Sequence, residues 1–152
     1  MRSAVVMLLA APLALCGGLK LKPLTADEQR LLNAPGSPKV VGVHRALPAD
    51  ALRKGRWQKT ATGEQQWRLE IQSPGAAALR VEFASFQAGE GKAEVCEKGG
   101  KRCHGPYTAQ TLMDQGSFWS DVVDGDTIVI RYTAGTRSAA PPFRLARISH
   151  MR

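Results

Sequence analysis

Two neighbouring segments with alternating apolar and polar side chains constrain the fold most strongly. In residues 67–71 and 79–83 every second side chain is large and apolar. This two-residue period is typical of β-strands with one buried face, and Ser73-Pro74-Gly75 between the segments is a turn sequence. A change of phase at Ala84-Ser85 is expected to bring Phe86 onto the apolar face. The pattern therefore predicts adjacent strands that cover a hydrophobic core.

The rest of the chain continues with short segments separated by turns. Asp124-Gly125 is a dipeptide typical of a hairpin between two strands. With 15 glycines and 9 prolines against 6% aromatic residues, the composition disfavours a bundle of long helices. The sequence predicts an all-β fold, an antiparallel β-sandwich that is jelly-roll-like. Further extended segments are expected at residues 39–47, 55–62, 118–123, 127–133 and 143–148.

One short helix is expected before these strands. Thr25-Ala26-Asp27-Glu28 has the form of a capping box, which predicts a helix over residues 25–33 with Leu31 and Leu32 on one side. The prolines and glycine of residues 34–38 would end it.

The first sixteen residues have the form of an export signal. Arg2 precedes the apolar run from Ala4 to Leu15, and Cys16 is followed by two glycines. The run is too short for a transmembrane segment, which needs roughly 20 apolar residues. We expect a signal peptide at 1–16, a leader with the helix at 17–38 and the sandwich at 39–152, in a secreted or periplasmic protein. The alternative for this N-terminal segment is that Cys16 is lipidated.

The two remaining cysteines flank a glycine pair. Counting outward from Gly99-Gly100 as a two-residue turn places Cys96 opposite Cys103. Directly opposed residues of a hairpin are close enough for a disulfide, and export favours oxidation, so the count predicts a Cys96–Cys103 bond. Zinc binding with His104 and the distant His150 is the competing interpretation. It lacks the second closely spaced ligand pair that structural zinc sites usually show.

The formal net charge of +8 indicates attraction to anionic partners. The basic residues are scattered along the chain, however, and no nucleic-acid-binding motif accompanies them. We therefore expect a solvated basic surface and no nucleic-acid partner.

The aromatic residues have two interpretations. Trp67, Phe83, Phe118 and Trp119 are expected in the core, because each lies on a predicted strand. Trp57 and Tyr107 are the candidate residues of an exposed ligand surface, although a turn packed beneath Tyr107 is the alternative.

Three acidic residues stand close together in the sequence. Asp121, Asp124 and Asp126 have a spacing that could offer oxygen ligands to calcium, whereas Asp124 also belongs to a turn. Calcium sites usually have six or more oxygen ligands, so we expect neither a metal ion nor any other cofactor. A small metal-dependent enzyme would need Asp121 and Asp126 to converge with a histidine.

The ordered set of motifs resembles a known family. These motifs run from Trp67-Arg68-Leu69-Glu70-Ile71 through Gly105-Pro106-Tyr107 and Gly116-Ser117-Phe118-Trp119-Ser120 to the closing segment 143–150. Over roughly residues 39–151 the chain resembles the region that precedes the protease domain in secreted bacterial trypsin-like serine peptidases of the lysyl endopeptidase type. The resemblance implies a non-catalytic N-terminal sandwich that acts as a propeptide or accessory domain, present here without the peptidase domain that would follow Arg152.

The residues agree with a non-catalytic role. His44, His104 and His150 are far apart in the sequence, and no serine stands in a nucleophile-elbow signal. The partner implied by the resemblance is the peptidase domain, and we expect a monomer. The alternative is a stand-alone exported module that binds polysaccharide, cell envelope or protein through one face of the sandwich.

Overall fold

The computed structural model describes residues 17–36, 39–111, 116–138 and 140–152. The expected signal peptide and the lipidation candidate Cys16 lie outside the described residues. One helix and a short 3₁₀ turn accompany the strands: β1 (Gly17–Lys20), α1 (Ala26–Asn33), β2 (Gly42–Ala46), η1 (Ala51–Lys54), β3 (Arg56–Lys59), β4 (Gln65–Gln72), β5 (Ala78–Ala84), β6 (Lys92–Glu97), β7 (Cys103–Tyr107), β8 (Ser117–Trp119), β9 (Val123–Asp124), β10 (Thr127–Ala134) and β11 (Arg144–Met151).

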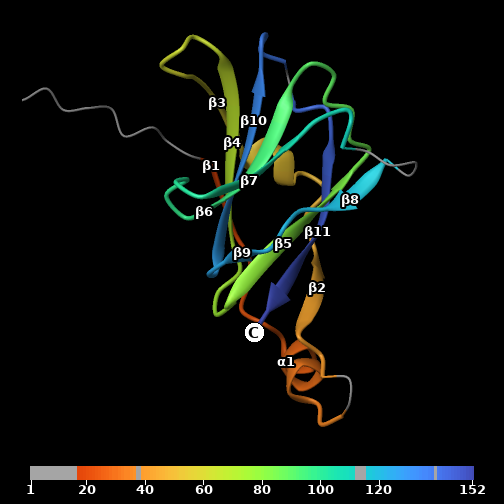
Figure 1. The fold of residues 1–152 in the computed structure, drawn as a ribbon. Helices are drawn as coiled ribbons and strands as arrows, with labels where there is room; N and C mark the ends of the chain where they lie inside the picture. The colour runs from red at the N-terminus through yellow and green to blue at the C-terminus, as the bar shows by residue number, and fades with distance from the viewer. Residues whose placement is uncertain (1–16, 37–38, 112–115, 139) are drawn as a thin grey trace, which may run out of the picture.

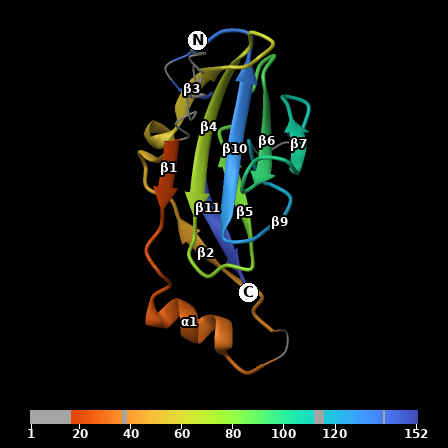
Figure 2. The same cartoon turned by 90° about the vertical axis from the view of Figure 1, so that its left-hand side faces the viewer.

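The strands form two sheets that pack face to face (Figures 1 and 2). Sheet A has the order β1-β4-β10-β6-β7, with β3 also paired to β4, and sheet B has the order β2-β11-β5-β8, with β9 also paired to β5. Without β1 and β3, and with β8 and β9 counted as one interrupted strand, two four-stranded sheets remain in the double Greek-key order of a jelly roll. The predicted jelly-roll-like sandwich is confirmed. Its strand pairs are antiparallel except for β1, which runs parallel to β4.

The core lies between the inner faces of the sheets. Phe83 is fully buried at its centre, and its ring centroid lies 5.1 Å from those of both Phe118 and Phe143. The expected change of phase occurs at Ser85, whose φ of 49° turns the strand so that Phe86 also faces inward. Of the predicted core aromatics, Trp67 and Phe83 are buried and Phe118 packs partly buried against them.

The hairpin predicted at Asp124-Gly125 is wrong. β9 pairs with β5 in sheet B, whereas β10 pairs with β4 and β6 in sheet A. The glycine has a φ of 98° and donates its N–H to the Ala77 carbonyl, so this turn carries the chain from one sheet to the other. A dipeptide that favours positive φ marks a tight turn but does not determine which strands the turn joins.

The helix begins as the capping box predicts. The Thr25 side chain accepts from the Glu28 N–H, and the Glu28 carboxylate accepts from the Thr25 N–H. The prediction that both leucines share a side is wrong, because Leu32 is buried and Leu31 is 57% exposed. Successive helical residues are rotated by roughly 100° about the helix axis, which here turns Leu32 toward the sandwich and Leu31 toward solvent. The helix lies at one end of the sandwich, beside β2 (Figure 2).

A strand pairing and a set of hydrogen bonds from Arg45 help to attach the expected leader to the sandwich. β1 lies along residues 69–72 of β4, and Arg45 of β2 donates to the Glu28 carboxylate and to the Lys22 carbonyl. None of the helical segments in the described ranges is long and apolar enough to cross a membrane.

Candidate functional site

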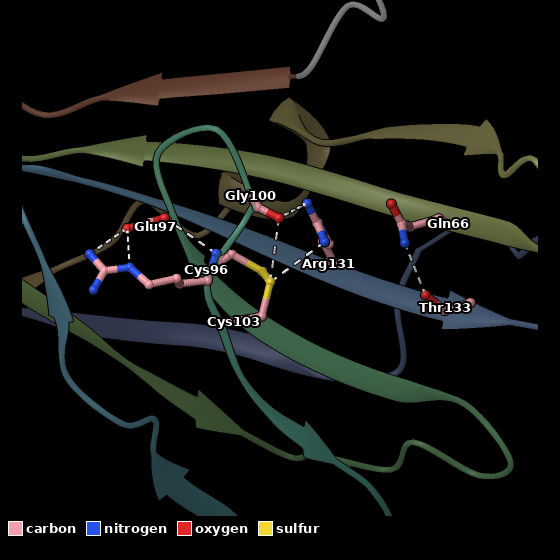
Figure 3. Close-up of a disulfide and its surroundings, with 8 residues drawn as sticks. Gln66, Cys96, Glu97, Gly100, Cys103, Arg131 and Thr133 are labelled. Atoms are coloured by element: carbon pink, nitrogen blue, oxygen red, sulfur yellow. Dashed lines mark hydrogen bonds and ion pairs between the residues drawn. A yellow bond between two sulfur atoms is a disulfide. The ribbon is translucent and has the colours of Figure 1, made fainter.

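The cysteine hairpin has the predicted register. Cys96 and Cys103 are directly opposed and form a disulfide, and both Gly99 and Gly100 have the positive φ that their turn requires. Arg131 of β10 donates to the Gly100 carbonyl over 2.6 Å and contacts the Cys103 sulfur, as Figure 3 shows. The two sulfurs are bonded to each other, and the hairpin is braced against the outer face of sheet A.

The candidate ligand residues Trp57 and Tyr107 pack inward. Trp57 is half-buried, with its ring edge-on to Tyr132 at 6.3 Å. Tyr107 is 7% exposed, and its hydroxyl donates to the Asp121 carboxylate and accepts from the Asp121 N–H. Burial, together with the neighbouring carboxylate, raises the pKa of Tyr107 well above its ordinary value. In this structure the two residues therefore do not form a flat, exposed aromatic surface.

The three aspartates have separate partners. The Asp121 carboxylate binds the Tyr107 hydroxyl, Asp124 is exposed on β9, and the Asp126 carboxylate accepts from Gln72 and Thr127. The hydrogen bonds from Gln72 and Thr127 lower the pKa of Asp126. No group of three histidine, cysteine or carboxylate side chains that could hold a metal occurs within the described ranges.

The three histidines lie on three different strands. His44 on β2 and His104 on β7 are exposed, and His150 on β11 is buried. The His150 Nδ1 lies 2.8 Å from the Ser73 Oγ, to which Arg45 also donates over 3.0 Å. Ser73 is fully buried, so a substrate cannot reach this serine–histidine pair. The pair instead belongs to a buried polar network that continues through Arg45 to Glu28.

The predicted core position of Trp119 is wrong. In β8, Phe118 is directly opposite Phe83 and points into the core, so Trp119, one residue later, points outward. The indole is half-buried on the outer face of sheet B, and its centroid lies 4.8 Å from the imidazole of His44.

Two arginines lie over the Trp119 ring. The guanidinium carbons of Arg80 and Arg147 are 4.7 Å and 5.5 Å from its centroid, within the range of cation–π attraction. Arg147 is also fixed by Glu82, to which it donates over 2.6 Å and 3.1 Å. We call these residues, His44, Arg80, Glu82, Trp119 and Arg147, the Trp119 face.

The outer face of sheet A carries a different basic cluster. Arg56, Arg68 and Arg131 are directly opposed on β3, β4 and β10, with Glu94 of β6 opposite Arg131. A Cβ atom placed on Gly100 would clash with Nη2 of Arg131 and lie 3.5 Å from Nη2 of Arg68, so both guanidinium groups approach the hairpin tip. The positive φ of 70° favours glycine at this turn, whereas the flexible Arg131 side chain could move to make room for a Cβ atom.

Sequence reasoning missed the Trp119 face, although one signal for it was present. Phe118 and Trp119 are adjacent in a predicted strand, and adjacent strand residues point to opposite faces. One of the two must therefore face solvent. The sequence could not show that Arg80 and Arg147, which are 67 positions apart in the chain, would meet at that indole.

The chain matches a known protein family. The family model described as the lysyl endopeptidase N-terminal domain matches residues 17–152. A search of curated proteins finds no match. The matched region begins at β1 and so includes the leader as well as the sandwich.

Proposed function

Because the chain belongs to the lysyl endopeptidase N-terminal domain family, we propose that it is a propeptide-type accessory domain, exported with a serine peptidase and acting on its catalytic domain. The observation that carries this proposal is the extent of the match, which takes in both sheets and the helix. A family defined by its place before a catalytic domain is expected to support that domain rather than to repeat its chemistry.

The arrangement of side chains supports a non-catalytic role. The contact between Ser73 and His150 is buried, and the exposed histidines His44 and His104 lie on different sheets. The disulfide supports export, because such bonds persist in oxidising compartments.

A refolding assay tests the propeptide role. Mature lysyl endopeptidase from the same organism is denatured and diluted into buffer with or without one equivalent of the chain, and its recovered activity on a lysyl substrate is measured. We expect the chain to raise the recovered activity severalfold.

The matched control is the Phe83→Asp variant, which places a charge at the centre of the core and cannot close the sandwich. This variant should give no increase. Equal recovery with the folded chain, the Phe83→Asp variant and buffer would contradict the proposed role.

A further inference from the structure

The Trp119 face presents an aromatic ring and two guanidinium groups together on one outer sheet surface. Its residues come from all four main strands of sheet B: His44 from β2, Arg147 from β11, Arg80 and Glu82 from β5, and Trp119 from β8. We propose that this face binds an acidic surface of the peptidase catalytic domain, an inference that rests on the proposed function.

The face is already ordered in the free chain. Arg147 is held by two hydrogen bonds to Glu82, and Trp119 lies against both arginines and His44. Side chains that are fixed before binding lose little conformational entropy on association. Tryptophan and arginine are also the residue types that most often dominate the binding energy of protein interfaces.

The charge of the face determines the chemistry of its partner. Arg80, Arg144 and Arg147 lie near Glu82. The other outward acidic side chain on the described strands of sheet B is Asp124 of β9, which lies opposite Ala78 and outside the Trp119 face. Within the described part of the chain, Arg80 forms no ion pair, and its Nε is buried without a hydrogen-bond partner. A carboxylate of the partner beside Arg80 would therefore form an ion pair with Arg80, as Glu82 does with Arg147.

The basic cluster on sheet A fits this role less well. Its outward residues on β4 and β6 include Glu70 and Glu94, and Arg131 already donates to the Gly100 carbonyl. The aromatic side chains of β4 and β10 are Trp67 and Tyr132, and both are buried on the inner side. Arg68 serves as a matched control on the opposite outer face, because among the described residues its Nε is also buried without a hydrogen-bond partner, whereas the cation–π contact with Trp119 belongs to Arg80.

The test is an isothermal titration of the chain into mature lysyl endopeptidase from the same organism. The peptidase serine is first blocked covalently, so that the enzyme cannot digest the chain. We expect Trp119→Ser to weaken binding about thirtyfold and Arg80→Gln about tenfold, as for central interface residues. Arg68→Gln should change the dissociation constant by less than about threefold. Added salt should weaken binding of the unmodified chain more than binding of Arg80→Gln.

The outcomes separate the proposed function from the proposal that the Trp119 face is the contact surface. If the unmodified chain binds and both Trp119→Ser and Arg80→Gln bind equally well, the Trp119 face is not the contact, and the proposed function survives. If Arg68→Gln weakens binding as much as Arg80→Gln does, attraction is diffuse and the inference is wrong. If the unmodified chain does not bind, the proposed function fails and the inference fails with it. Circular dichroism checks that the Trp119→Ser variant is folded. If that variant is unfolded, the affinity of Arg80→Gln alone decides whether the Trp119 face is the contact.

Discussion

At the scale of single residues, the buried polar network explains how a short N-terminal segment is held to the sandwich. Arg45 lies between Glu28 of the helix and Ser73 of the β4–β5 turn, and Ser73 contacts His150. Burial, together with the positive charge of Arg45, lowers the pKa of His150. For Glu28, burial acts to raise the pKa, but the Thr25 hydrogen bonds and Arg45 together hold it below its ordinary value.

The lowered pKa of His150 predicts a pH-dependent stability. In the unfolded chain the imidazole takes up a proton below about pH 6.5, whereas in the folded protein it stays neutral to lower pH. The free energy of unfolding should therefore be highest above pH 6.5 and decrease as the pH falls through that value toward the lowered one. Urea unfolding at a series of pH values measures this. His150→Gln should flatten the profile between about pH 5 and 7, and an unchanged profile would contradict the assignment.

Removing the central cation of this network should release the leader. Arg45→Ala leaves Glu28 and Ser73 without their shared donor and is expected to lower the free energy of unfolding by about 2 kcal/mol. In this variant, amide hydrogen exchange should become faster in the helix than in the unmodified chain, while exchange in the core strands changes less. Arg53→Ala, at an exposed position on η1, is the control and should leave both measurements unchanged.

At the scale of elements, the cysteine hairpin is a local brace. The disulfide closes a loop with a sequence separation of only 7, so its loss releases little chain entropy. Replacing both cysteines by alanine should cost about 2 kcal/mol at most and should increase hydrogen exchange selectively in β6 and β7. Equal loosening of β5 and β11 in sheet B would show instead that the bond supports the whole fold.

Local sequence patterns predicted where the strands and the helix lie better than they predicted which strands pair with one another. The alternation of residues 67–71 and 79–83, the glycine pair at the cysteine hairpin and the capping box are each patterns within a few neighbouring residues, and the structures that they predict all occur. The partner of β10 depends on residues far away in the sequence, so Asp124-Gly125 was assigned to the wrong connection. Trp119 shows the same limit, because its contacts come from three other strands.

At the scale of the whole molecule, one aromatic cluster joins the two sheets. Phe83 of β5 contacts Phe86, Phe118 and Phe143, and the ring of Tyr107 from sheet A lies 6.0 Å away. Phe83→Ala should remove the centre of this cluster and lower the free energy of unfolding by about 3–5 kcal/mol. Chemical denaturation measures the loss. A cost below about 1 kcal/mol would contradict a single continuous core.

The outer faces of the two sheets carry different sets of side chains. Sheet A carries the disulfide and Arg131, which binds the hairpin, whereas sheet B carries the Trp119 face, on which Arg80 forms no ion pair within the described part of the chain. Under the proposed function, the Trp119 face would be the surface that contacts the catalytic domain.

The central claim is that this sandwich forms a complex with a lysyl endopeptidase catalytic domain. Sedimentation velocity of an equimolar mixture of the chain and the serine-blocked peptidase tests it most directly. We predict one boundary that moves faster than either protein alone, with the mass of a one-to-one complex. Two boundaries at the separate sedimentation coefficients, at concentrations where both proteins are folded, would contradict the account.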